Sequence, residues 1–237
     1  MIENKNLKVG ANSELFFSKI PTLKKRQISI PELVKGKKVL SIGCVDMVKN
    51  IPLDDFIKNG MHQMYNLKES TSELIGIDIN KEGLNELKSH GFNVEYLDVF
   101  SVDETHPICN ENFDFIVVSH VIEHIPDLFG FLTAIKNKFK FKNIIIAVPN
   151  AYKYKSLLNV VFLKKEVISN DHFHTFSPTT AIKITESIGF SVCNVYFDDD
   201  FNGIKLGQKY KLLGLFNSLL RRVVFKSNGD IIIHAKN

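Results

Sequence analysis

The stretch Lys38-Val-Leu-Ser-Ile-Gly43, followed along the chain by Leu74-Ile-Gly-Ile-Asp78, decides the fold of this protein. Each piece is a short apolar run, rich in β-branched residues, that ends at a glycine or an acid. Runs of this length without polar alternation are typical of parallel strands that are covered on both faces. The same pattern predicts further strands at 94–97, 115–118, 144–148 and, as a closing strand, 230–234.

Segments with helical periodicity separate the central strands. Asn80 is predicted to cap one helix, and Ser177, followed by Pro178, to cap another. Between these two, apolar residues recur at helical spacing over 128–135. Strands that alternate with helices indicate an α/β fold, so we expect a mostly parallel sheet with helices on both faces.

The chain shows no internal repeat or low-complexity linker, so we expect one domain over 37–237. The basic segment 1–36 is predicted to be an N-terminal helical lid, and 151–175 a lid over the acceptor. An amphipathic helix near the C-terminus is predicted to pack onto the sheet, with contact to a membrane surface as the less frequent alternative. Its residues are Leu212, Leu215, Phe216, Leu219 and Leu220, followed by Arg221 and Arg222.

The composition is that of an ordinary globular protein. Of 237 residues, 44% are hydrophobic and 24% are charged, which excludes a disordered, collagen-like or coiled-coil chain. The net charge of +4 and the pI of about 8.8 are too small an excess to require a nucleic-acid partner. The three cysteines are widely spaced, and we see no signal-peptide pattern and no apolar run of about 18 residues. We therefore expect a cytoplasmic protein without a membrane span.

Polar residues follow the predicted strands, where an open parallel sheet binds its ligands. Gly43 allows either a close approach of the backbone to a ligand or a plain tight turn. Asp78 is placed to accept hydrogen bonds from the two hydroxyls of a ribose. Because Val45 and Asp46 interrupt a G-x-G-x-x-G pattern, the sequence favours a nucleoside ligand without a pyrophosphate group.

The chain resembles the class I S-adenosylmethionine-dependent methyltransferases over about residues 36–200, because seven short motifs of that family occur in the family's order. The last two motifs are most similar to small bacterial enzymes of glycan and metabolite biosynthesis. The resemblance implies a Rossmann-like fold with a seven-stranded sheet, and S-adenosylmethionine as the cofactor. The matching motifs are 38–43, 74–78, 113–118, 121–124, 144–150, 171–178 and 188–190.

The resemblance also implies roles for single residues. The loop that follows the first strand would contact the methionine part of the cofactor through Ser41, Gly43, Cys44 and Val45. Further along the chain, the predicted cofactor residues are Asp78 and Ile79 at the ribose, Asp98 and Val99 at the adenine, and Ser119. The family usually has an acid where Ser41 stands and a second glycine where Val45 stands, so we expect a loop that is reshaped, with Asp46 taking part, or that binds less tightly.

His120, Glu123 and His124 form an H-x-x-E-H motif, and a helix would place them on one face. Pro126 is too close for the long helix of a metallopeptidase. Some metal-dependent O-methyltransferases resemble this motif, which would give a divalent-metal site at His120, Glu123, His124 and a later histidine, His172 or His174. We expect structural hydrogen bonding more often than a metal. Without a metal, His120, His124 or His172 is a candidate general base.

Three functions remain open at this point. The first is O-methylation of a small molecule or glycan precursor, for which a histidine-rich site suits an acceptor hydroxyl. The second is a module that binds the cofactor without catalysis, suggested by the altered residues Ser41 and Val45. The third is a metal-dependent RNA 2′-O-methyltransferase, whose basic groove would be Lys24, Lys25, Arg26 and 35–38; the modest net charge disfavours nucleic acid.

Overall fold

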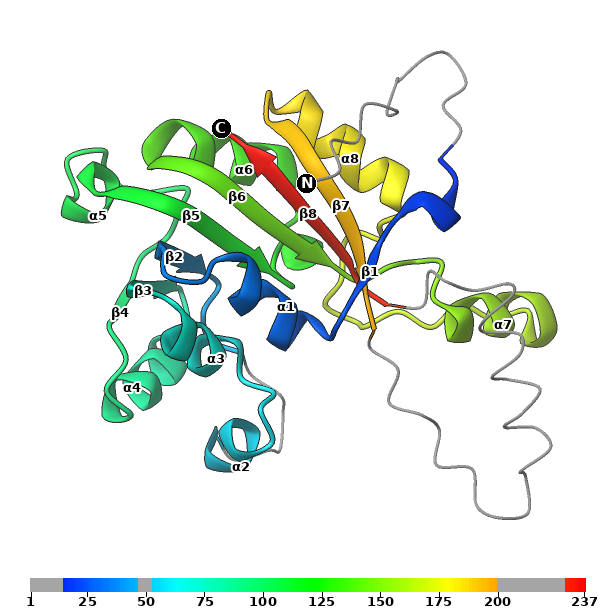
Figure 1. The fold of residues 1–237 in the computed structure, drawn as a ribbon, viewed down its shortest axis with the longest axis horizontal. Coiled ribbons are helices and arrows are strands. Elements are labelled where there is room, and N and C mark those ends of the chain that lie inside the picture. Colours follow the sequence, from blue (N-terminus) through cyan, green and yellow to red (C-terminus); the bar gives the residue numbers. More distant parts are fainter. Residues whose placement is uncertain (1–14, 47–52, 200–228) are drawn as a thin grey trace.

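The structure, a computed structural model, describes residues 15–46, 53–199 and 229–237. Its centre is one eight-stranded sheet in the order β1-β7-β8-β6-β5-β2-β3-β4 (Figure 1). The strands are β1 (Thr22–Leu23), β2 (Lys38–Ile42), β3 (Glu73–Asp78), β4 (Val94–Tyr96), β5 (Asn112–Ser119), β6 (Lys140–Val148), β7 (Ser191–Asp198) and β8 (Ile231–Lys236). The strands predicted from the apolar runs are confirmed, with bounds that differ by a few residues.

The sheet is mostly parallel, as predicted. Pairs β2–β3, β2–β5, β3–β4 and β5–β6 are parallel, whereas β8 runs antiparallel between β6 and β7. The predicted number of seven strands is one too low, because Thr22 and Leu23 pair with Phe197 and Asp198 at the edge of β7. A strand of two residues is too short to leave an apolar pattern in the sequence.

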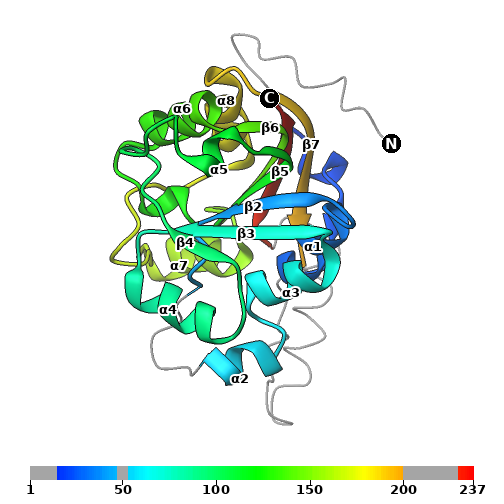
Figure 2. The same ribbon diagram turned by 90° about the vertical axis from the view of Figure 1, so that its left-hand side faces the viewer.

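Helices cover both faces of the sheet (Figure 2). The helices and 3₁₀ turns are η1 (Phe17–Lys19), α1 (Arg26–Leu33), α2 (Leu53–Lys58), α3 (Gln63–Ser70), α4 (Lys81–Ser89), α5 (Pro107–Asn110), η2 (Ile122–His124), α6 (Leu128–Lys138), α7 (Tyr154–Leu163) and α8 (Pro178–Ser187). The predicted caps are confirmed: the Asn80 side chain accepts from the Gly83 N–H at 3.0 Å, and Ser177 forms a capping box with Thr180. Short polar caps thus begin the crossover helices.

Alternate residues of each central strand point to opposite faces and form two cores. On one face Val39, Phe115 and Ile145 pack with α1 and α3. On the other face Leu40, Ile116 and their neighbours pack with the apolar residues of α6 and α8. Because both faces are buried, each central strand reads as a continuous apolar run in the sequence.

Part of the segment that was expected to form an N-terminal lid joins the fold through β1 and α1, and its role as a lid stays a prediction. In α1, Ser29, Ile30 and Pro31 are buried. The predicted C-terminal amphipathic helix, from Leu212 to Leu220, lies outside the described residues. Within 15–46, 53–199 and 229–237, we find no helix that is long and apolar enough to cross a membrane.

Candidate functional site

A pocket of about 540 Å³ opens at the carboxyl ends of β2, β3, β4 and β5. This is the edge at which parallel α/β sheets bind ligands, because loops diverge there from the ends of neighbouring strands. Its volume is in the range of small-molecule sites. The lining residues are Arg26, Ile42, Gly43, Val45, Asp46, Ile77, Asp78, Ile79, Leu97, Asp98, Val99, Phe100, His120, Val121, His124, Ile125, Phe131 and Asp171.

The loop after β2 turns sharply at Gly43. Gly43 has a φ of 70°, and a Cβ atom placed there would lie 2.3 Å from Val121 Cγ2. Its N–H donates to the Ile77 carbonyl at 2.9 Å, so this amide is not aimed at the pocket. The glycine therefore allows the loop to approach Val121 closely. Gly43 contributes only backbone atoms to the wall of the pocket.

Asp78 stands at the end of β3 and lines the pocket. Its Oδ2 accepts from the Val45 N–H and its Oδ1 from the Asn80 N–H, each at 2.9 Å. These two bonds fix the carboxylate against the neighbouring loop. Each oxygen has a second lone pair, so the carboxylate can still accept from a ribose diol.

The end of the pocket near β3 and β4 is largely apolar. Ile79 and Phe100 are 64% and 45% exposed, and buried Leu97 lies between them in the chain. Exposed apolar side chains on the wall of a pocket suit a planar ring. Asp98 at this end accepts from the Phe100 N–H and the Ser101 hydroxyl, which form a tight local turn.

The H-x-x-E-H motif does not lie on one helix, as the spacing had predicted. Only Ile122–His124 is helical, as the short 3₁₀ turn η2, and Ile125 is already extended ahead of Pro126. His120 precedes the turn with a φ of 56°, a left-handed conformation that is unusual for a residue other than glycine. His120 therefore does not share a helical face with Glu123 and His124.

The imidazole of His120 lies between two buried carboxylates. Its Nε2 is 2.8 Å from Asp230 Oδ2, and its Nδ1 is 3.6 Å from Glu123 Oε1. Asp230 also forms ion pairs with Lys153 and with Arg26, whose Nε lies 3.7 Å away. Burial alone would raise the pKa of the Asp230 carboxyl, but His120 and Lys153 hold it well below its ordinary value. Asp230 is therefore ionised and fixes one side of the His120 ring.

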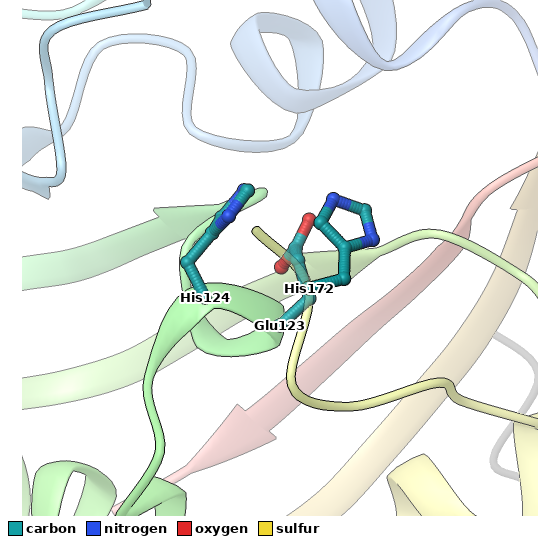
Figure 3. A group of neighbouring side chains, drawn as sticks. All are labelled: Glu123, His124 and His172. Atoms are coloured by element: carbon teal, nitrogen blue, oxygen red, sulfur yellow. The ribbon is translucent and has the colours of Figure 1, made fainter. Parts of the chain in front are cut away.

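Glu123, His124 and His172 converge (Figure 3). Of the three, His124 lines the pocket. Their ligand atoms lie within 4.8 Å of one another, and the rings of His124 and His172 meet edge to face at 4.6 Å. Burial raises the pKa of Glu123, whereas burial and the neighbouring His124 lower that of His172. Among the described residues, neither carboxylate oxygen of Glu123 has a hydrogen-bond partner. A cluster with these properties is able to accept a proton or to bind a cation.

His174, which was named with the predicted metal ligands, lies apart from this cluster. Its Nε2 is 3.0 Å from the Ile125 carbonyl and 3.2 Å from the Pro126 carbonyl. The structure thus groups His172, the other candidate for the later histidine, with Glu123 and His124.

A family model described as a methyltransferase domain matches residues 17–195, which is most of the chain. The chain belongs to the class I S-adenosylmethionine-dependent methyltransferases. The subgroup of glycan and metabolite enzymes remains a prediction.

Solved structures share the fold of this methyltransferase. An S-adenosylmethionine-dependent methyltransferase from Archaeoglobus fulgidus is 24% identical, with a TM-score of 0.56 over 90% of this chain and 91% of its own. The small RNA methyltransferase HEN1 is 15% identical, with a TM-score of 0.57 over 90% of this chain and 25% of its own. The methyltransferase domain of a bacterial Hen1 is 16% identical, with a TM-score of 0.51 over 90% and 98%. No curated protein matches the chain.

The predicted cofactor residues of the methyltransferase fall into two groups. Gly43, Val45, Asp78, Ile79, Asp98 and Val99 line the large pocket. Ser41, Cys44 and Ser119 instead line a second, much smaller cavity of about 10 Å³. Burial, followed by the charge of Asp78, raises the pKa of the Cys44 thiol well above its ordinary value, so this cysteine is not a nucleophile.

Three charged residues of the site were not predicted from the sequence as site residues. Arg26 lines the pocket and its Nη1 donates to the Ser119 hydroxyl at 2.9 Å, but the sequence offered it only as part of a basic cluster. Asp230 immediately precedes the closing strand β8, and Lys153 lies in the predicted lid. Asp230 is buried against His120 and pairs with Lys153, and contacts of this kind depend on the folded chain.

Proposed function

We propose that this methyltransferase transfers a methyl group from S-adenosylmethionine to a hydroxyl of a small molecule or glycan precursor. The observation that carries the proposal is the position of the Glu123, His124 and His172 cluster beside a nucleoside-sized pocket. Acceptor hydroxyls have a high pKa and gain from a base, and imidazole is the side chain that best serves as one near neutral pH.

The pocket offers a group for each part of the cofactor. Ile79 and Phe100 provide apolar surface for the adenine, and the fixed carboxylate of Asp78 accepts from the ribose. Arg26 is the cation that suits the carboxylate of the methionine part, because a guanidinium binds a carboxylate with two parallel hydrogen bonds. When bound, the cofactor supplies a methyl group that its sulfonium already activates.

The residues of this chain then have to align the acceptor and remove its proton. His172 is the best general base, because its lowered pKa keeps the imidazole neutral at physiological pH. His124 lies at its edge and orients it, with Nδ1 3.2 Å from the Asp171 carbonyl. His120 is held by Asp230 and acts as a positioning residue at the back of the site.

An assay of S-adenosylhomocysteine release across hydroxyl and matched amine acceptors tests this function. We expect turnover with a hydroxyl acceptor, a decrease in kcat of roughly a hundredfold in His172→Gln, and an unchanged Kd for S-adenosylhomocysteine. Asp78→Ala is expected to lose the cofactor instead. His90→Gln, at the exposed end of α4, is the control and should behave as wild type. Turnover only of amines, or full activity of His172→Gln, would contradict the proposal.

The same assay tests the non-catalytic alternative, which predicts cofactor binding without turnover of any acceptor. For the RNA alternative, Lys24 and Lys38 of the expected basic groove are engaged with acids: Lys24 with Glu32, and Lys38 with Glu73 and Glu111. RNA binding that falls steeply with salt would nevertheless support that alternative.

A second candidate is metal-assisted methyl transfer. The buried carboxylate of Glu123, which has no hydrogen-bond partner among the described residues, favours it. Glu123, His124 and His172 would bind the ion through one oxygen and two nitrogens, a set that suits zinc or another transition metal more than magnesium. The metal would then take the place of the base in polarising the acceptor hydroxyl. Chelation should abolish turnover, and zinc or manganese should restore it; full activity of metal-stripped protein would exclude this route.

A further inference from the structure

A water-sized cavity adjoins the cofactor pocket beneath the loop after β2. Its volume is about 10 Å³, and its walls include Ser41, Asp46, Gln63 and Ser119. Gly43 and Asp46 line both this cavity and the large pocket, so the two spaces share one wall. A space of this size holds a single group as large as a water molecule.

Gln63 is the residue of this cavity that needs an explanation. Its side chain is only 5% exposed, and neither Oε1 nor Nε2 has a hydrogen-bond partner among the described residues. Its neighbours Met64 and Leu67 already supply the apolar contacts of α3 with the core. A buried amide without a partner is unfavourable, and an apolar residue of similar shape would pack without that penalty. The position of Gln63 therefore indicates a ligand that hydrogen-bonds to its amide.

Asp46 lies next to Gln63 and places a carboxylate at the wall of the same cavity. Its Oδ2 accepts from the backbone N–H of Gln63 at 3.2 Å, which joins the loop after β2 to the first turn of α3. Ser41 adds a buried hydroxyl. Besides the amide donor Gln63 Nε2, the cavity thus offers three acceptors, the Asp46 carboxylate, the Gln63 Oε1 and the Ser41 hydroxyl, and these acceptors suit an ammonium group.

The cavity lies at the end of the pocket where the amino-acid part of the cofactor belongs. The apolar surface of Ile79 and Phe100 lies toward β4, and Asp78 lies at the end of β3. A cofactor with its adenine at β4 and its ribose at Asp78 extends along the strand order toward β2 and β5. Its amino-acid group then reaches the loop after β2, beside Asp46 and Gln63.

We propose that Gln63, with Asp46, binds the α-amino group of the cofactor. The Gln63 Oε1 accepts one N–H of the ammonium, and the Asp46 carboxylate neutralises its charge. Arg26, which lines the large pocket, is the cation for the carboxylate of the same amino-acid group. This assignment rests on the proposed role of the large pocket as the cofactor site, and makes Gln63 a residue that selects the amino-acid part of the ligand.

Calorimetric titration with two ligands tests the proposal without any acceptor. S-adenosylhomocysteine carries the amino-acid group, whereas 5′-methylthioadenosine lacks it. In Gln63→Leu we expect the Kd for S-adenosylhomocysteine to rise roughly tenfold to hundredfold, as for loss of a hydrogen bond to a charged group, and the Kd for methylthioadenosine to stay within about twofold. The Tm of ligand-free Gln63→Leu should equal or exceed that of wild type.

Asn66→Leu is the matched control on the same helix, because its amide already has a partner in the Gly60 carbonyl at 3.0 Å. We expect Asn66→Leu to lower the Tm and to leave both Kd values unchanged. Wild-type affinity of Gln63→Leu for S-adenosylhomocysteine, or an equal loss of both ligands, would overturn the proposal. Failure of the wild-type protein to bind either ligand would instead overturn the assignment of the pocket, and this proposal with it.

Discussion

The backbone conformation and close surroundings of Gly43 limit which residues the loop after β2 can accommodate at this position. Its φ of 70° and the 2.3 Å that would separate a Cβ from Val121 Cγ2 both disfavour a side chain. Val45 in the same loop does carry a side chain, and its backbone is held by the hydrogen bond that its N–H donates to Asp78. A single residue thus sets how closely the loops after β2 and β5 approach each other.

Gly43→Ala should therefore destabilise the protein by about 2 kcal/mol, from the left-handed backbone and the contact with Val121 together. For a domain of this size that corresponds to a decrease in Tm of about 4–8 °C. A second substitution, Val121→Ala, should relieve the contact and recover part of the loss. A thermal melt of the single and double variants checks this, and equal Tm values for Gly43→Ala and wild type would contradict it.

At the scale of the element, the H-x-x-E-H motif shows that helical spacing in the sequence does not place side chains on one face when the segment forms only a short turn. Three residues of 3₁₀ structure end before Pro126, so the i, i+3 and i+4 positions never come to share a helical face. The left-handed His120 instead contacts Asp230, just before β8, and His172 from a distant loop joins Glu123 and His124. The side chains that form the cluster are therefore Glu123, His124 and His172, not the three residues of the motif.

The α8 cap gives a prediction at this scale. Ser177 accepts from the Thr180 N–H at 3.1 Å, and Thr180 in turn accepts from the Ser177 N–H at 2.8 Å. Ser177→Ala should reduce the free energy of unfolding by about 1 kcal/mol. Urea denaturation measures this, with Ser187→Ala at the exposed end of the helix as a control that should change it by less than about 0.5 kcal/mol. Equal losses in the two variants would show that the cap contributes nothing.

Across the whole molecule, buried histidines link stability to pH. Burial lowers the pKa of His62 from 6.5, and the same cause acts on His234. The unfolded chain therefore binds protons more readily than the native protein below about pH 6.5, and stability is lost as the pH falls through that value. Burial next to Asp230 raises the pKa of Asp198 to about 6, which opposes this trend between pH 6 and 3.8 because the native state takes up that proton first.

His62→Asn tests the histidine contribution. Asparagine keeps an acceptor for the Tyr65 N–H, which His62 Nδ1 now binds at 3.3 Å, but it does not titrate. We expect lower stability at pH 7 and a flatter decline toward pH 5, with a slope reduced by at most about 1.4 kcal/mol per pH unit. Urea midpoints at pH 7, 6 and 5 give the slope. An unchanged slope would place the pH dependence elsewhere.

The sequence by itself determined the parallel core, the helix caps and the membership of a methyltransferase family, because local patterns of apolar and capping residues encode them. Apolar runs such as 144–148 indicate strands that are buried on both faces, and Asn80 and Ser177 indicate where helices begin. Only the tertiary structure decided which polar groups meet. Asp230 reaches His120 across 110 positions of sequence, and Gln63 lines one cavity with Asp46. Such pairings depend on how the loops pack after folding, and no local spacing records that.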